Sequence, residues 1–133
     1  MTTYARLEAL RALRRNELEG ALAKLEQART GLAHAERRLQ EVRAEAKILA
    51  AAGPGLPRDP MPAAWLACGS ALHALGVERA THFAALEEEG LRRIEAARET
   101  CGRAGEAAAR ATYALRAIER GMAAARRAGS HRS

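Results

Sequence analysis

A heptad repeat constrains the fold of this chain more than any other sequence feature. Apolar residues recur seven apart in two interleaved rows, separated by steps of three and four. This spacing places one apolar stripe along a helix and is typical of a helix that packs against another helix. In the first half of the chain the rows are Leu18, Leu25, Leu32, Leu39 and Ala46, interleaved with Ala21, Ala28, Ala35, Val42 and Leu49.

The second half of the chain carries a repeat of the same kind. The chain has only four aromatic residues, and its apolar residues are mostly Ala and Leu beside abundant Arg and Glu. That composition is typical of long helices, and the scarcity of Val and Ile disfavours a sheet. The second pair of rows is Ile94, Cys101, Ala108, Leu115 and Met122, interleaved with Ala97, Ala104, Ala111, Ile118 and Ala125.

One break separates the two halves. The segment Ala51–Pro62, "AAGPGLPRDPMP", holds four prolines and two glycines and cannot continue a helix. The sequence therefore predicts an all-α fold, in which two long helices form an antiparallel coiled-coil hairpin with a Pro/Gly-rich turn near residues 51–62. We expect one domain over 1–133: a first arm over about 3–51, a turn over 52–62 with Asp59 as the next helix cap, a second arm over about 63–128, and a basic tail over 129–133.

The repeat is expected to change phase in three places. Arg11 and Arg14 fall at positions of the apolar rows, which predicts a phase shift or a frayed end near the N-terminus. The second arm is expected to begin with an apolar row of its own, and to change phase around 79–83 and again between Leu86 and Ile94. Its six glycines predict either close helix approach or weak places in a long helix. The early row is Trp65, Cys68, Leu72 and Leu75.

Folding the chain at the break predicts a register. If Ala52 lies level with Ala63, then Leu32 is level with Phe83 and Tyr4 with Ala111. Residues 112–128 would then extend beyond the first arm by about 25 Å, at 1.5 Å per residue. This overhang would expose an apolar stripe in water and would need a partner outside the hairpin. The stripe consists of Leu115, Ile118 and Met122.

Charge distinguishes the two ends of the predicted hairpin. Residues 1–16 carry a balance of +3 and residues 110–133 a balance of +5, whereas residues 77–100 carry −2 and residues 60–77 carry no charge. In an antiparallel hairpin the two basic segments lie at the open end, and the uncharged segment around Trp65 lies at the tip. The sequence predicts a rod with two dissimilar ends, which would link two partners.

No motif for catalysis is present. Glu87, Glu88 and Glu89 point in three directions on a helix, the histidines lack the spacing of a zinc site, and "GPGLP" has neither the Lys-Ser/Thr nor the preceding strand of a phosphate loop. We expect no enzyme activity, no cofactor, no metal and no small-molecule substrate. There is no secretory signal, residues 60–77 are too interrupted for a membrane span, and the two cysteines are unpaired, so we expect a cytoplasmic protein.

The chain resembles the FliJ/YscO family, the central-stalk proteins of flagellar and type III secretion export ATPases. The resemblance lies in the first arm, "ELEGALAKLEQARTGLAHAERRLQEVRAEA", with its "AERRL" cadence, and in the layout of a long helix, a proline-containing break and a longer second helix. It covers nearly the whole chain in architecture more than in identities, and the alanine-rich C-terminus departs from the Lys/Glu-rich ending of many members.

The resemblance implies a stalk that inserts its open end into a hexameric secretion ATPase and points its tip at the export gate, a protein of the inner membrane. Secretion chaperones would be further partners, and the protein would be cytoplasmic and peripheral to the secretion apparatus. The tip residues would be Trp65, Leu66 and Leu72. The ring-binding residues would be Arg6, Arg11, Arg14, Arg15, Leu115, Arg116, Ile118, Arg120, Met122, Arg126 and Arg127.

Two other functions are compatible with the same sequence. A coiled-coil adaptor or escort chaperone would bind helices of other proteins along the apolar rows. A DNA-bridging basic rod would neutralise phosphates with its terminal arginines, but nucleic acid is disfavoured because no zinc finger and no aromatic platform is recognisable. Self-association, and the choice among flagellar, virulence and symbiosis secretion, stay open.

Overall fold

Two long α-helices make up the described part of the chain. The computed structural model describes the backbone of residues 2–51 and 63–131, and the side chains of residues 2–51 and 69–129. Helix α1 spans Thr3–Ala51 and helix α2 spans Ala63–His131, with no strand in these ranges. The prediction of an all-α fold with two long helices is confirmed. The predicted turn over 52–62, with its Asp59 cap, lies outside the described residues.

The start of α1 is fixed by a side-chain cap. The hydroxyl of Thr2 accepts a hydrogen bond from the backbone N–H of Ala5 at 3.2 Å, and the Thr2 carbonyl accepts the first helical bond from Arg6. Threonine is a favoured residue at this position because its oxygen satisfies an N–H that has no partner in the first turn. Within the described residues no φ is positive and no peptide is cis, so both helices keep regular geometry.

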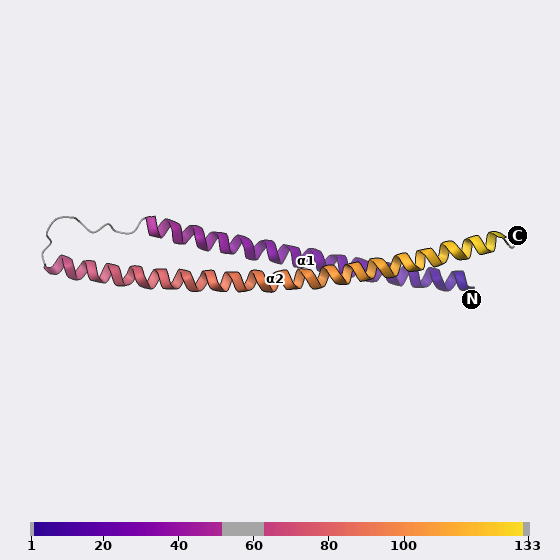
Figure 1. The fold of residues 1–133 in the computed structure, drawn as a ribbon, viewed down its shortest axis with the longest axis horizontal. Helices are drawn as coiled ribbons and strands as arrows, with labels where there is room; N and C mark the ends of the chain where they lie inside the picture. The colour runs from indigo at the N-terminus through magenta and orange to yellow at the C-terminus, as the bar shows by residue number, and fades with distance from the viewer. Residues whose placement is uncertain (1, 52–62, 132–133) are drawn as a thin grey trace. The chain divides into compact units, whose positions relative to one another are not determined.

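The chain divides into two compact units. Unit 1 comprises Met1–Leu32 and Ala97–Ser133, and unit 2 comprises Ala33–Ala96. Each unit therefore holds one piece of α1 and one piece of α2. In unit 1 the start of α1, indigo in Figure 1, lies beside the yellow end of α2, and a hydrogen bond joins Tyr4 to Arg126. The two pieces run antiparallel in each unit.

The apolar seam of α1 reaches Tyr4 without a phase shift. Tyr4, Leu7, Arg11 and Arg14 are all half-buried and keep the three–four spacing of the rows that follow, whereas Leu10 and Leu13 are exposed. The predicted shift near the N-terminus is therefore wrong. Arginine can occupy such positions because its long aliphatic stem covers apolar surface while the guanidinium reaches water.

The seam of α2 begins at Phe83 and runs in one phase to Ala125. Glu87 is half-buried and Gly90 is buried, and they fill the positions between Phe83 and Ile94. The predicted phase change between Leu86 and Ile94 is wrong. The repeat continues through Glu87 and Gly90, which a search for apolar residues does not count. From Ser70 to His82 every residue is exposed, so the predicted early row, as far as its side chains are described, is not a seam.

In unit 2 the register is defined by two contacts. A Cβ on Gly90 would lie 3.0 Å from Cδ1 of Leu39, so the two helices approach closely where a side chain is absent. One turn further along α1, Nε of Arg43 donates to Oε1 of Glu87 at 2.9 Å. Leu39, Val42 and Ile94 form the buried core of this unit.

In unit 1 the same spacing brings large residues level with small ones. Arg126 is next to Ala125 of the apolar rows; counting in sevens from Tyr4 and Ala125, the leucine row of α1 falls opposite an alanine row of α2. Interlocking of large and small residues fills the seam without crowding it. The level pairs are Leu18 with Ala111, Leu25 with Ala104, and Leu32 with Ala97.

Candidate interaction surfaces

The end of unit 1 is a paired helix end and not an overhang. Nε of Arg126 donates a hydrogen bond of 2.8 Å to the Tyr4 hydroxyl, and a second nitrogen of the same guanidinium, Nη2, donates to it as well. Tyr4 therefore lies beside Arg126, fifteen residues beyond its predicted neighbour Ala111. The predicted overhang over 112–128 is wrong, because the first turns of α1 lie against these residues.

The predicted apolar contacts for an ATPase ring are consequently part of the protein's own seam. Met122 is only 3% exposed, and Leu115 and Ile118 are half-buried. On the register of unit 1 these two lie level with Arg14 and Arg11, whose stems are half-buried as well. The aspartate substitutions that would test an overhang would here place charge in a seam and destabilise the fold.

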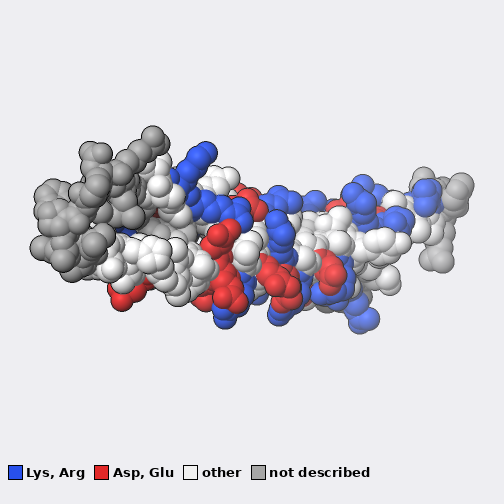
Figure 2. Space-filling view, turned by 60° about the vertical axis from the view of Figure 1, so that its left-hand side comes forward, with Lys and Arg blue, Asp and Glu red and all other residues white. Residues whose placement is uncertain are grey.

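Both chain ends in unit 1 are strongly basic. Residues 3–16 and 110–129 together hold nine arginines and two glutamates, whereas the whole chain has a net charge of +6. The positive excess of the protein is thus concentrated in these two segments, which the Tyr4–Arg126 bond places side by side. Next to the grey terminal residues, the face drawn in Figure 2 shows blue side chains with little red among them.

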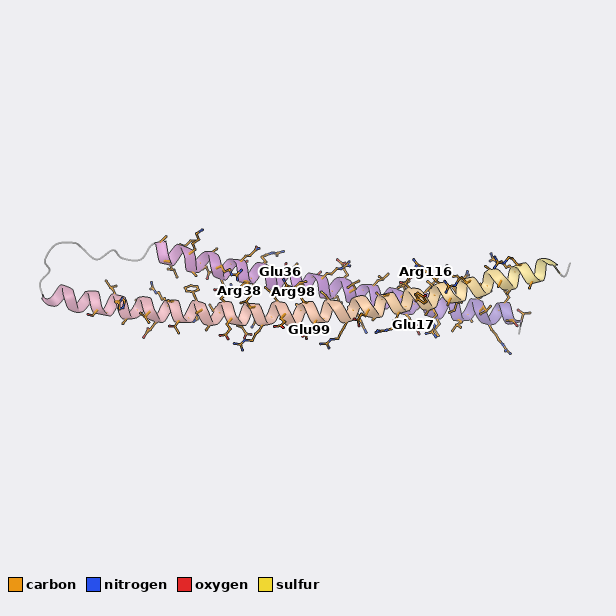
Figure 3. The ribbon with its side chains drawn as sticks, in the orientation of Figure 1. Glu17, Glu36, Arg38, Arg98, Glu99 and Arg116 are labelled. Atoms are coloured by element: carbon orange, nitrogen blue, oxygen red, sulfur yellow. The ribbon has the colours of Figure 1, made fainter. Side chains whose placement is uncertain are left out.

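Most of these arginines are available to a partner. Arg14 pairs with Glu17 at 2.8 Å, and Arg126 is bonded to Tyr4. Arg116 and Glu17 are both labelled in Figure 3, and no ion pair joins them. Among the described carboxylates none pairs with the remaining seven, of which all but the half-buried Arg11 are exposed. These are Arg6, Arg11, Arg15, Arg110, Arg116, Arg120 and Arg127.

In unit 2, α2 continues past the end of α1. The Arg43–Glu87 pair sets Ala51 level with residue 79, so about 16 residues of α2 lie beyond the last residue of α1, which Figure 1 also shows. This part of α2 is uncharged up to Val77. Leu72 is 47% exposed, and Leu75 and Val77 are exposed as well. The predicted tip residues Trp65 and Leu66 have backbone in α2, but their side chains lie outside the described part.

The acidic run of α2 is occupied by ion pairs. Glu87 binds Arg43, Glu88 binds Arg92 at 3.4 Å, and Glu89 binds Arg93 at 3.1 Å. The three carboxylates thus point in different directions, as the helical spacing predicts. Cys101 is half-buried in the seam. Among the residues that the structure describes there is no group of three or more possible metal ligands. Neither helix, as far as it is described, contains a stretch apolar enough to cross a membrane.

The sequence reasoning missed one surface residue. Tyr113 is 73% exposed, which makes it the most exposed large hydrophobic side chain of the described residues. The sequence already indicated this exposure. Tyr113 lies two residues from Ala111 and two from Leu115, both members of the apolar rows, and must therefore face away from them. Comparison with known protein families, with curated proteins and with solved structures finds no match to this chain.

Proposed function

We propose that this protein is a non-enzymatic coupling subunit of a type III or flagellar secretion apparatus. Its basic end, formed by residues 3–16 and 110–129, would bind the hexameric export ATPase. The uncharged part of α2 in unit 2 would contact the export gate. The protein would act in the cytoplasm, peripheral to the inner membrane.

The observation that carries this proposal is the charge at the end of unit 1. Seven arginines without a described carboxylate partner surround a two-helix end that the chain's own seam closes. Such an end offers a rigid, positively charged plug to an acidic opening in a partner. A stalk of this kind changes the activity of a ring because it binds some subunit conformations more tightly than others.

The alternative of an adaptor that captures foreign helices along the apolar rows has less support. In α1 the rows are half-buried or buried from Tyr4 to Ala46, and in α2 from Phe83 to Ala125. A helix from another protein would have to displace the protein's own partner helix. The arginine surface and residues 70–77 of α2 are instead exposed without any rearrangement.

The test is stimulation of the purified export ATPase of the same organism. The triple variant Arg6→Glu, Arg15→Glu and Arg116→Glu reverses three exposed charges that make no described ion pair. We expect it to lose binding and stimulation while its helix content stays unchanged. The matched control is the triple variant Arg37→Glu, Lys47→Glu and Arg79→Glu, which reverses three exposed charges of unit 2 that make no described ion pair and should stimulate like the unmodified protein. Full stimulation by the triple variant would refute the proposal.

A further inference from the structure

A second surface of unit 1 is built around Tyr113, on the outer side of α2. The side chain is 73% exposed and makes no hydrogen bond or ring contact within the described residues. At about 100° per residue, Tyr113 lies opposite the seam that holds Leu115, Ile118 and Met122. Packing in the protein therefore does not explain an aromatic ring at this position.

Arginines flank the ring along the helix. Arg110 and Arg116 are three residues away on either side, which places them next to Tyr113 on the helix surface. Arg120 and Arg127 continue the line within about 60° of Tyr113 around the axis. None of these four has an ion pair with a described carboxylate, and all are exposed.

From Ala109 to Arg127 the rest of this face is small and uncharged, and Glu106, one turn before Arg110, ends it. Ala109, Ala117 and Ala124 fill the positions between the arginines, and no acidic residue lies on this line from Ala109 to Arg127. Glu119, the acid of this segment, lies about 120° away from Tyr113. A chain of anionic groups could therefore lie close to the helix over about 25 Å, the length from Arg110 to Arg127.

From this face we infer that the protein binds single-stranded nucleic acid along α2, through Tyr113 and four arginines that also belong to the end proposed to bind the ATPase. Arginines in line neutralise successive phosphates, and an exposed aromatic ring among them stacks on an unpaired base. A base in a duplex is already stacked and cannot use the ring. Phosphate neutralisation and base stacking do not depend on the sugar, so DNA and RNA should bind alike.

The test uses fluorescence anisotropy with a labelled dT20 strand, an rU20 strand and a 20-base-pair duplex, on the full chain. We expect both single strands to bind more tightly than the duplex. Their affinity should fall with salt with a logarithmic slope of about −3, as expected for four phosphate contacts. Tyr113→Ala should weaken single-strand binding about tenfold, the loss of one stacked base, and leave duplex binding unchanged. Tyr113→Phe keeps the ring and should bind like the unmodified protein.

Charge variants separate the arginine line from the general basicity of the chain. Arg120→Gln should reduce the salt slope by about 0.7, whereas Arg92→Gln, which removes an exposed arginine of unit 2, should leave it unchanged. The inference is overturned if neither strand binds at 0.1 M salt, or if Tyr113→Ala binds single strands normally. Equal binding of polyglutamate of matched charge would indicate an acidic protein as the partner and would overturn it as well. In the ATPase assay Tyr113→Ala should stimulate like the unmodified protein, because it keeps all the arginines. The two proposals can therefore fail separately.

Discussion

Gly90 offers a sharp test of the helix packing, because a side chain there would meet Leu39. A Cβ would lie 3.0 Å from Cδ1 of Leu39 and 3.6 Å from its Cβ, and Leu39 is only 4% exposed. We expect Gly90→Leu to crowd this contact at a cost of about 1–3 kcal/mol, the usual range for overpacking a filled core. The better helix propensity of leucine offsets up to about 0.8 kcal/mol of that cost.

Gly102→Leu is the matched control. Gly102 also lies within α2, but a Cβ there would have no neighbour within 4 Å. This variant keeps the gain in helix propensity and loses nothing to crowding, so it should be up to about 0.8 kcal/mol more stable than the unmodified protein. The propensity term is common to both variants. The difference between their free energies of unfolding should therefore be the crowding term alone, about 1–3 kcal/mol.

A compensating pair tests the contact itself. Leu39→Ala alone should cost about 2–5 kcal/mol because it empties a buried site. In the double variant Leu39→Ala/Gly90→Leu the large residue has moved to the other helix. The double variant should be more stable than the sum of the two single changes by at least about 1 kcal/mol.

Urea unfolding followed by far-UV circular dichroism measures all four variants. The urea concentration at the midpoint of unfolding should differ between the variants. The slope of the unfolding free energy against urea concentration should stay constant, since the surface exposed on unfolding hardly changes. If Gly90→Leu is as stable as Gly102→Leu, or if the double variant shows no coupling, then Leu39 and Gly90 are not in contact and the register in unit 2 is refuted.

Three further predictions concern the register and the surface pairs. Met122→Ala should lower the free energy of unfolding in urea by about 2–4 kcal/mol, because the side chain is 3% exposed. A loss below about 0.5 kcal/mol would mean that α1 does not cover Met122, as the predicted overhang requires. In a chain with both native cysteines changed to serine, Leu7→Cys and Met122→Cys should form a disulfide on oxidation, detected by gel mobility. The pair Tyr4→Cys and Ala111→Cys should not, and the opposite pattern would contradict the register of unit 1. Arg43→Ala should cost less than about 1 kcal/mol in the same unfolding assay, because its ion pair with Glu87 is about half exposed on both sides; a larger loss would mean that this pair fixes the fold.

The fold follows from the sequence because the heptad spacing is local. Nineteen of the twenty residues in the two predicted pairs of rows are half-buried or buried, and Leu49 alone is exposed. The helix limits near Thr3 and Ala51 follow from Thr2 as a cap and from the prolines that begin after Ala51. Nothing about these features depends on which residues meet across the seam.

The register does not follow from the heptad spacing, because two antiparallel helices can slide by seven residues and still match their rows. The expectation of a tight fold at the break set Leu32 against Phe83, a large residue against a large one. The structure instead sets Leu18, Leu25 and Leu32 level with alanines of α2, and Leu39 level with Gly90. The side-chain volumes of the facing residues can be read from the sequence, and they would have distinguished the two registers.

The candidate surfaces were predictable to different degrees. The basic end follows from the arginine count alone. Its apolar part was misjudged, because Leu115 and Ile118 lie level with two seam arginines that a search for apolar residues rejects. The exposure of Tyr113 follows from its place between the rows, but its meaning depends on the unpaired arginines beside it, and ion pairs cannot be read from a sequence.

The two register contacts differ in how much chain lies between their partners. Arg43 and Glu87 are 44 residues apart, whereas Tyr4 and Arg126 are 122 apart. In an unfolded chain, closing the longer loop costs about 0.9 kcal/mol more, at about 0.6 kcal/mol per doubling of length. We therefore expect helix pairing to begin in unit 2 during folding and to reach the chain termini last. The arginines of unit 1 would then come together only in the final step, so that a binding partner meets them only on a chain that has finished folding.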